Sequence, residues 1–334
     1  MNSALRPVYN RFAEVGSAGI LYPAYKIFSV LFVGVCVVAM LTVGCSKARK
    51  DAISVLNKGV VALDQGAPNS AYDFFLEASH IDPSFAEAFY HLGLVQYHER
   101  QELHAARDSL NQAVTLEPTH KDALYQLGRL SYELNDHSSA QKFLRLALEQ
   151  DGELAGAHYF LGLVADELGD LREADVRFRD AIVYDPHLNT AYSALGRLYE
   201  RVGAEEAATQ VYKEAIRLNP TDVDNRKLLA GIMARRGRGE DAVELLTRAF
   251  EFGTGDQEIL FSLANAHLMA GNDVAAQALL ERYVSRPENG DITPPKNIHV
   301  AQVVLDNLRR KAELRKQEEL KNAAAPPTSH APPP

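Results

Sequence analysis

The sequence predicts an all-α fold, a solenoid of antiparallel helix pairs, and three observations indicate it. Apolar residues recur at three- and four-residue steps, as in residues 189–222, where they give one stripe on each of two helices. Small residues recur in register at steps of 34 residues. Proline recurs where each second helix must end. One helix pair of this size buries too little surface to be stable, so neighbouring pairs must complete its core.

The recurring positions form four columns. The first helix of each pair contributes one small residue, in the order Gly59, Gly93, Gly128, Gly162, Gly196, Ala230 and Ala264. The second helices contribute Ala71, Ala106, Ala140, Ala174, Ala208, Ala242 and Ala276, and then Ala78, Ala113, Ala147, Ala181, Ala215 and Ala249. The helix-ending column is Pro83, Pro118, Gly152, Pro186 and Pro220. One extra residue lies around Arg100–Glu102, between Gly93 and Ala106.

These columns resemble the tetratricopeptide repeat over residues 52–288. We therefore expect seven antiparallel helix pairs stacked in a right-handed superhelix. Their expected bounds are 52–85, 86–120, 121–154, 155–188, 189–222, 223–256 and 257–288.

Residues 1–44 are expected to be a signal peptide or a membrane anchor. Ile27–Gly44 is 18 residues without a charge, about 27 Å as a helix and just enough to cross a bilayer core. The residues up to Cys45 resemble the bacterial lipobox, which implies cleavage before Cys45 and lipids on that cysteine, with residues 45–51 as a short tether. The alternative is an uncleaved transmembrane helix flanked by the positive charges of residues 47–50.

The C-terminal part is expected to close the array. Residues 289–296 are rich in turn residues and predict a loop. Residues 297–322 predict a helix whose first half is apolar on one side, through Ala301, Val304, Leu305 and Leu308, and whose second half is charged. The first half would cap the solenoid, as terminal segments of repeat arrays do. The alanine- and proline-rich tail 323–334 is expected to be disordered.

The sequence contains no pattern that predicts catalysis, a cofactor or a metal site. It lacks the zinc-protease, nucleophile-elbow, phosphate-loop and dinucleotide motifs. His91, His98 and His104 are the densest histidine group, but their steps do not place them on one helix turn. Anchor, repeats, cap and tail use the whole chain, so we expect no enzyme. The net charge of −9 disfavours a nucleic-acid partner.

The resemblance to the tetratricopeptide repeat implies an inner groove, lined by the first helix of each pair, that holds a segment of a partner protein. The residues that map to it form an aromatic wall in repeats two to four and a cationic wall in repeats five and six. They are Tyr90, Tyr97, Tyr125, Arg129, Tyr132, Tyr159, Arg197, Arg201, Lys227 and Arg235. This pattern predicts a partner segment that is apolar at one end and acidic at the other. Alternatively, the tyrosines are common packing residues and the arginines only keep the surface solvated.

These features together predict a non-enzymatic adaptor, lipid-anchored in the bacterial envelope. Ser46, where enterobacterial lipoproteins retained in the inner membrane have aspartate, favours the periplasmic face of the outer membrane. The layout is similar to the pilotin-type lipoproteins of type IV pilus secretins. Two alternatives stay open: a scaffold held at the inner membrane by an uncleaved helix, and an accessory subunit that positions a cell-envelope enzyme.

Overall fold

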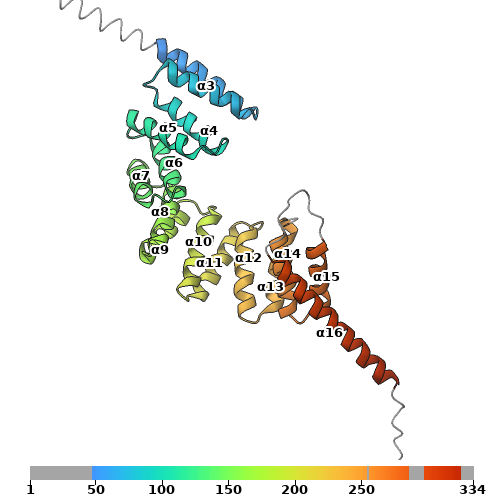
Figure 1. The fold of residues 1–334 in the computed structure, drawn as a ribbon. Coiled ribbons are helices and arrows are strands. Elements are labelled where there is room, and N and C mark those ends of the chain that lie inside the picture. Colours follow the sequence, from blue (N-terminus) through green and yellow to red (C-terminus); the bar gives the residue numbers. More distant parts are fainter. Residues whose placement is uncertain (1–46, 254–255, 286–296, 325–334) are drawn as a thin grey trace, which may run out of the picture. The chain divides into compact units, whose positions relative to one another are not determined.

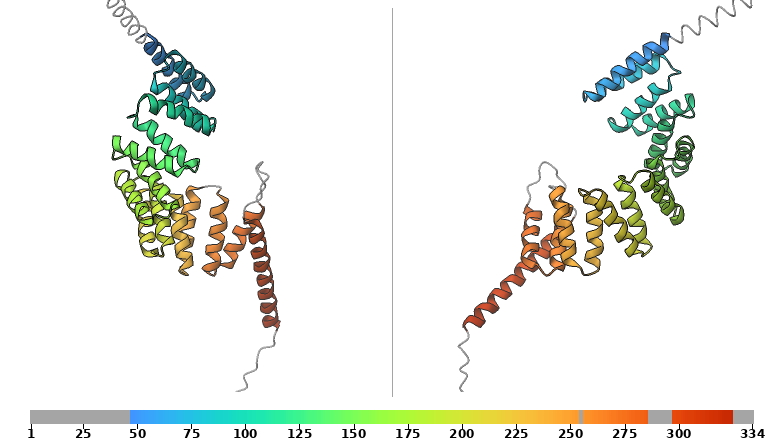
Figure 2. Two further views of the ribbon diagram at one scale, coloured as in Figure 1. Left: turned by 60° about the vertical axis from the view of Figure 1, so that its left-hand side comes forward. Right: turned by 180° about the vertical axis from the view of Figure 1, so that it is seen from behind.

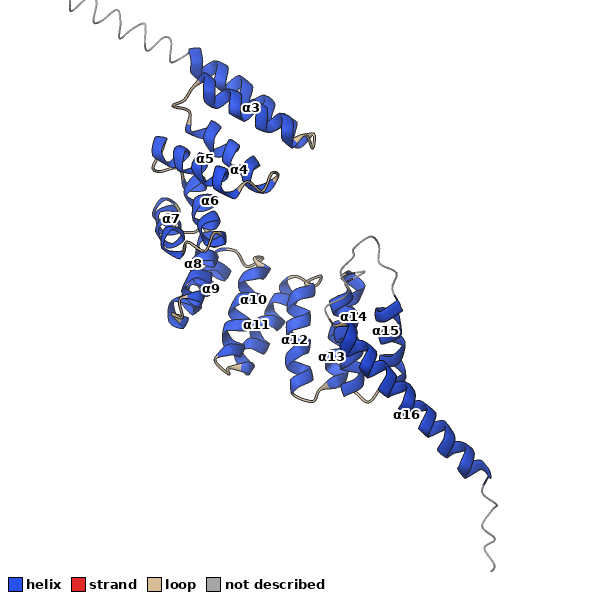
Figure 3. Ribbon diagram, viewed as in Figure 1, coloured by secondary structure: helices blue, strands red, loops and turns tan. Residues whose placement is uncertain are grey.

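In the computed structural model of the chain, residues 47–253, 256–285 and 297–324 are described. All regular structure in these residues is helical (Figure 3). The chain divides into two compact units between Leu130 and Ser131, and each unit is described by itself. The predicted right-handedness of the superhelix depends on how the parts are placed relative to each other, so it stays a prediction.

The first unit begins with a helix over residues 47–64. The helices that follow are α3 (Pro68–Ile81), α4 (Ala86–His98), α5 (Leu103–Leu116) and most of α6 (Lys121–Glu133). Consecutive helices lie side by side, as Figure 1 shows for α3, α4 and α5.

The second unit contains four helix pairs and a half, which continue the same alternation, and one long terminal helix. Its helices are α7 (His137–Gln150), α8 (Ala155–Glu167), α9 (Leu171–Tyr184), α10 (Asn189–Arg201), α11 (Glu205–Leu218), α12 (Val223–Arg235), α13 (Gly239–Phe252), α14 (Gln257–Met269), α15 (Asp273–Ser285) and α16 (Ile298–Ala324). Together with the first unit they make seven helix pairs followed by α16, so the predicted all-α repeat fold is confirmed.

Within a pair, the small residue of the first helix makes room for a large side chain of the second. A Cβ atom on Gly162 would lie 2.6 Å from the ring of Phe178, and one on Gly93 would lie 2.8 Å from Leu110 Cγ. Gly59 and Gly196 accommodate the rings of Phe75 and Tyr212 in the same way. All four large side chains are buried: Phe75, Leu110, Phe178 and Tyr212.

The alanine columns lie where helices pack closely: a Cβ on Gly93 would lie 3.3 Å from the backbone oxygen of Ala106 in the same pair. Every alanine in both columns has no exposed surface. The second helices end as the proline column predicts, because the residue before each proline is extended and cannot continue a helix. These extended residues are Asp82, Glu117, Asp185 and Asn219, and Asp151 does the same before Gly152.

The turn between the two helices of a pair uses a left-handed backbone position, which glycine adopts without steric cost. Gly203 occupies it between α10 and α11 with φ +78°. Between α4 and α5, Gln101 adopts the same left-handed conformation, with φ +54°. Gln101 comes three residues after the end of α4, whereas Gly203 comes two residues after the end of α10. The extra residue predicted around 100–102 is therefore accommodated in this turn.

The long helix α16 covers the last repeat with its first half only. Ala301, Leu305 and Leu308 are buried in one cluster with Tyr283 of α15, whose ring lies 5.3 Å from that of Phe261. Tyr283 stands where other repeats carry a small residue, because here the neighbour is a single capping helix. The second half of α16 is exposed and runs on beyond α15 (Figure 2).

The ends of the predicted segments differ in two places from the structure. Residues 47–51, predicted as a tether, belong to the first helix. Residues 323 and 324, predicted as part of the tail, belong to α16. Residues 1–46, the loop 289–296 and residues 325–334 lie outside the described residues.

Candidate functional site

The residues predicted to line a groove fall in both units. Tyr90, Tyr97, Tyr125 and Arg129 lie on the first helices of the first unit, and the other six lie in the second unit. The two sets are described in turn, and their predicted role in binding a partner stays a prediction.

Tyr90 of α4 lies near two carboxylates and two histidines. Its ring lies 5.2 Å from His91 and 4.8 Å from His120. One carboxylate, Glu87, contacts both imidazoles, at 3.5 Å from His91 and 3.0 Å from His120. Burial, helped by Asp122 and Glu87, raises the pKa of Tyr90 to about 12. Tyr90 therefore stays neutral and can present only a neutral ring edge and hydroxyl to a partner.

Tyr97 does not line an open surface. Only 5% of it is exposed, and the Arg129 guanidinium lies 5.1 Å from the centre of its ring. The sequence could not show this, because a tyrosine at the next-to-last residue of a helix looks the same whether a neighbouring side chain covers it or not. Tyr125 is half-buried, so it and Tyr90 remain the accessible aromatic residues of the set in this unit.

In the second unit, three interactions link each first helix to the next at the same place. The Tyr132 hydroxyl donates to Glu167 at 2.6 Å, Arg201 Nη1 donates to Asp166 at 3.1 Å, and Arg235 donates to Glu200. Each pair is 35 residues apart. In each case the twelfth residue of one first helix meets the thirteenth of the next. We call these three pairs the inter-repeat row.

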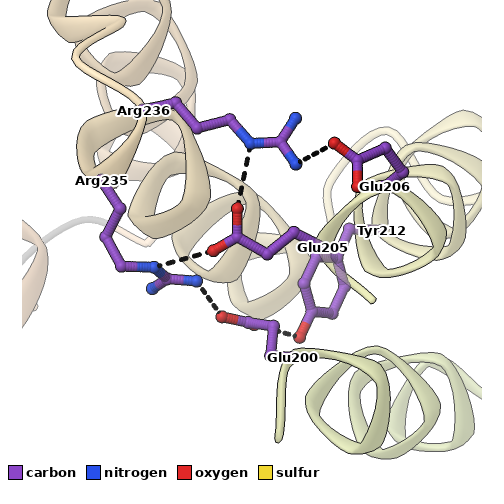
Figure 4. Close-up of polar contacts among 6 residues, drawn as sticks. All are labelled: Glu200, Glu205, Glu206, Tyr212, Arg235 and Arg236. Atoms are coloured by element: carbon purple, nitrogen blue, oxygen red, sulfur yellow. Dashed lines mark hydrogen bonds and ion pairs between the residues drawn. The ribbon is translucent and has the colours of Figure 1, made fainter. Parts of the chain in front are cut away.

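The last pair of the row belongs to a larger network among α10, α11 and α12 (Figure 4). Glu200 also accepts a hydrogen bond from the Tyr212 hydroxyl at 2.7 Å. Glu205 contacts both Arg235, at 3.5 Å, and Arg236, at 3.1 Å. Burial opposes the charge on Arg235, but Glu200 and Glu205 outweigh it and raise the pKa of the guanidinium. Arg235 is thus held by carboxylates of its own chain.

Lys227 is held in the same way. Its ammonium lies 2.6 Å from Glu258 and 3.7 Å from Asp256. Burial lowers the pKa of Lys227, but these carboxylates and Asp224 more than compensate, so the pKa is raised. The cationic wall predicted from the sequence is therefore corrected: Arg201, Lys227 and Arg235 are each neutralised by a carboxylate nearby in the fold.

Arg197 is different from the other three cations. It is exposed on α10 and, within the described part of the chain, makes no ion pair. It acts electrostatically on Tyr159: burial raises the pKa of the Tyr159 phenol, while a hydrogen bond with Thr190 and the charge of Arg197 oppose the rise. Tyr159 itself is half-buried, with its ring 5.2 Å from Phe160 and 6.2 Å from Phe178. A half-buried aromatic ring on α8 and an unpaired guanidinium on the neighbouring first helix α10 are thus close enough for the charge to affect the phenol.

The described residues show neither a metal centre nor a membrane span. No group of three or more histidine, cysteine, aspartate or glutamate side chains in the described ranges is arranged to hold a metal ion. None of their helices combines the length and apolar character needed to cross a bilayer. Cys45 and the apolar run before it lie outside the described residues.

Sequence reasoning missed the Glu87 contacts and the inter-repeat row. A signal for the row was present: Asp166 and Arg201, and then Glu200 and Arg235, are opposite charges separated by one repeat plus one residue. No comparable signal marks Glu87 and His120, because their contact depends on the turn before α6.

Two models of the tetratricopeptide repeat match the sequence, over residues 97–166 and 159–223. No curated protein matches it. Among solved structures, a tetratricopeptide repeat protein from Parabacteroides merdae is similar over 78% of this chain and 99% of its own, with 17% identity and a TM-score of 0.55. The Pseudomonas aeruginosa pilF structure is similar over 66% of this chain and 98% of its own, with 17% identity and a TM-score of 0.54.

A third solved structure, the Cut9–Hcn1 hetero-tetramer of APC/C, is similar over 64% of this chain and 42% of its own chain. Its identity is 18% and its TM-score 0.54. At these identities the likeness of all three structures establishes the fold alone.

Proposed function

Since the chain contains tetratricopeptide repeats, we propose that it is a non-enzymatic scaffold that binds a segment of a partner protein on the first-helix face of its second unit. The observation that carries the proposal is the exposed guanidinium of Arg197 on α10, whose charge acts on the half-buried Tyr159 of the neighbouring first helix α8. Surface arginines of this face otherwise serve the fold, since Arg201 and Arg235 link one repeat to the next. Arg197 is exposed and unpaired within the described residues, so its charge is available to a partner.

The chemistry of this pair defines the partner more narrowly than the sequence does. A guanidinium with free donors favours a carboxylate, which it can hold by two parallel hydrogen bonds. A half-buried tyrosine offers apolar contact area with few rotatable bonds to immobilise, as interface aromatics do. The partner segment would therefore place one acidic side chain on Arg197 and an apolar side chain against Tyr159. A long acidic stretch is not required, because Lys227 and Arg235 are already neutralised.

The scaffold is proposed to be anchored in the bacterial envelope by lipids on Cys45, facing the periplasm from the outer membrane. Support comes from the sequence before residue 47: an uncharged run followed by a lipobox-like cysteine. Two or more acyl chains on one residue give stable anchoring, whereas one chain is marginal. The intact mass of the membrane-extracted protein distinguishes the two anchors. A mass that starts at Cys45 and includes acyl chains supports the lipoprotein, and a mass that includes residues 1–44 supports the uncleaved helix.

The layout of anchor followed by repeats suggests assembly of an envelope complex, such as a type IV pilus secretin, as the process served. A role as accessory subunit of a cell-envelope enzyme remains the alternative. Crosslinking in native membranes followed by mass spectrometry identifies the partner and separates these roles.

The binding face is then tested with the identified partner. Arg197→Glu should slow association and weaken its salt dependence, because it reverses the charge that attracts the partner's carboxylate. Tyr159→Ala should raise the dissociation rate, at a cost of about 1–2 kcal/mol if the ring is a binding hot spot. Arg145→Glu, an equally exposed arginine on the second helix α7, is the matched control. Unchanged affinity in a folded Arg197→Glu variant contradicts the proposal.

A further inference from the structure

The first repeat begins almost directly after the predicted anchor. The apolar run ends at Gly44, and the first described helix starts at residue 47. Only Cys45 and Ser46 separate them, and two extended residues span about 7 Å at most. A lipid anchor on Cys45 would therefore hold the start of this helix close to the bilayer surface.

The start of this helix is fixed to the rest of the first unit by Arg49. Its Nε lies 2.5 Å from Asp82 Oδ2, and its Nη2 donates to the backbone oxygen and hydroxyl of Ser84 at 3.1 and 3.2 Å. Its guanidinium also lies 4.6 Å from the centre of the Phe85 ring. Arg49 is thus part of the fold, although the sequence groups it with Lys47 and Lys50 as a positive flank. Through it, the position of the anchor also sets the orientation of the first repeats.

The opposite side of the same helix is an exposed face that carries lysines. Its members recur at three- and four-residue steps and so share one side of the helix. They are Lys47, Lys50, Ser54, Asn57, Lys58, Val61 and Gln65, and all are exposed. We call this set the lysine face. Asp51 and Asp64 lie exposed at its two edges, so three lysines against two aspartates (3 − 2 = +1) leave the face slightly positive in a chain whose net charge is −9.

The lysine face is the open end of the repeat array. A groove of about 520 Å³ runs along it between the first helix and α3, lined by Asn57, Lys58, Val61, Gln65, Ser70 and Phe74 among others. At the other end of the array the last repeat also has no repeat beyond it. There α16 covers the open side through Leu305 and Leu308. In the described residues, the first repeat has polar and basic side chains at its open end, and none of the described helices covers it.

We propose that the lysine face lies on the anionic surface of the membrane that holds the N-terminal segment, so that the bilayer, and not a further helix, covers the open end of the array. The inference rests on the anchor in the proposed function. Lys47 lies at most about 7 Å along the chain from Cys45, within the Debye length of about 8 Å at physiological salt, and Lys50 follows about 4.5 Å further along the helix. Lysines at this distance are attracted to anionic headgroups. Val61 and Phe74 would face the interfacial region, where partly apolar side chains are tolerated.

The test measures how close the lysine face comes to lipid headgroups. The full-length, membrane-extracted chain is reconstituted in vesicles of phosphatidylcholine with phosphatidylglycerol, which also contain a lipid with a nitroxide quencher on its headgroup. A fluorescent amino acid replaces Asn57 in one sample and Gln112, an exposed residue of α5 in the same unit, in the other. We expect strong quenching at Asn57 and weak quenching at Gln112.

Charge reversal provides the matched comparison. Lys47→Glu, Lys50→Glu and Lys58→Glu together should reduce quenching at Asn57 to the level at Gln112. Replacing phosphatidylglycerol by phosphatidylcholine should have the same effect. Lys213→Glu, Lys316→Glu and Lys321→Glu together, which change the net charge equally on exposed residues of the second unit, should leave quenching at Asn57 unchanged.

The outcomes separate this inference from the anchor on which it rests. A chain that fails to float with the vesicles overturns both. A chain that floats but is quenched no more at Asn57 than at Gln112 overturns the membrane contact alone. Quenching that survives the lysine reversal overturns the electrostatic basis of the contact. Crosslinking of Asn57 to a second copy or to another protein in native membranes assigns the face to that partner and overturns the proposal as well.

Discussion

Gly162 and Phe178 occupy complementary positions: the ring of Phe178 fills the space that a side chain on Gly162 would need. A Cβ on Gly162 would approach the ring to 2.6 Å, and Phe178 is only 1% exposed, so the ring has nowhere to move. The same relationship holds between Gly93 and Leu110. The glycines of this column are therefore required by packing, although they lie inside helices, where glycine is unfavourable.

Gly162→Leu should destabilise the chain by about 1–3 kcal/mol, because the new side chain overpacks the contact with Phe178. Gly231→Leu is the control. Gly231 also lies inside a first helix, but a Cβ there would have only the flexible end of Arg235 within 4 Å, at 3.7 Å. That substitution should stabilise by about 0.5–1 kcal/mol through helix propensity alone. Urea unfolding of both variants checks the prediction, and equal effects would contradict it.

Phe178→Ala should cost about 3–5 kcal/mol, since it removes a fully buried ring and leaves a cavity beside Gly162. Phe178→Leu should cost less, because Leu110 fills the equivalent place beside Gly93. Thermal unfolding followed by circular dichroism measures both. A small loss in Phe178→Ala would mean that the pair α8 and α9 can collapse around the missing ring.

Gln101→Gly should stabilise the first unit by about 1 kcal/mol, because Gln101 is held at φ +54°, a conformation that costs an L-residue about that much. Asn135→Gly changes the corresponding residue of the turn between α6 and α7, at φ +58°. It should raise the free energy of unfolding by less, since asparagine tolerates this conformation better than glutamine. Denaturant titrations compare the two. A loss of stability in Gln101→Gly would show that the glutamine side chain has a role in the turn.

The contact between Arg49 and Asp82 should make stability depend on pH at the acid end. Burial raises the pKa of the Asp82 carboxyl, but hydrogen bonds from Arg49 and Ser84 outweigh it, and the pKa is lowered. A carboxyl with a lowered folded-state pKa contributes stability above its unfolded pKa, about 3.9, and loses it as the pH falls through the folded pKa.

The free energy of unfolding of the natural chain should therefore exceed that of Asp82→Asn at neutral pH, and the difference should shrink below about pH 4. Asp73→Asn, which changes an exposed aspartate of α3, should show no such trend. A difference between the natural chain and Asp82→Asn that stays constant down to the acid transition would rule the mechanism out.

The pair Glu200 and Arg235 should show a coupling energy of about 0.2–1 kcal/mol in a double-mutant cycle, since the arginine side chain is 52% exposed. The coupling should decrease as salt is added. Glu214 and Arg217, a pair within α11, provide the comparison for an ion pair that links no repeats. A coupling of zero at low salt would mean that the inter-repeat row contributes nothing to the stacking of repeats.

The repeat fold could be predicted from the sequence because the packing contacts that determine it are local and recur in successive repeats. Each contact of a column glycine with a large side chain lies within one helix pair, and the alanines of both columns are fully buried in every repeat. The extra residue near Arg100 was also visible, since it shifts every later column by one. That Gln101 would take the left-handed position was not visible, because either of the neighbouring residues could have absorbed the insertion.

The candidate site could be predicted only in part. Position along a first helix placed Tyr159 and Arg197 on one face, and in the structure the charge of Arg197 opposes the rise in the pKa of Tyr159. The same rule selected Arg201 and Arg235, which the fold neutralises through Asp166 and Glu200. Helix periodicity gives the face on which a charge lies but not the charge opposite it on the next helix, so the cationic character of the wall was overestimated.

The inter-repeat row has a consequence for changing the length of the array. Residues 189–222 carry both halves of the interaction, an acid at Glu200 and a base at Arg201, together with the internal contact of Gly196 and Tyr212. If this segment is duplicated after Asp222, the first copy's Glu200 meets the second copy's arginine, and the second copy's glutamate meets Arg235. The link of the inter-repeat row and the packing of Tyr212 against Gly196 are then regenerated at each junction. The segment is therefore compatible with a second copy of itself, and the array before α16 can be lengthened by whole copies of it.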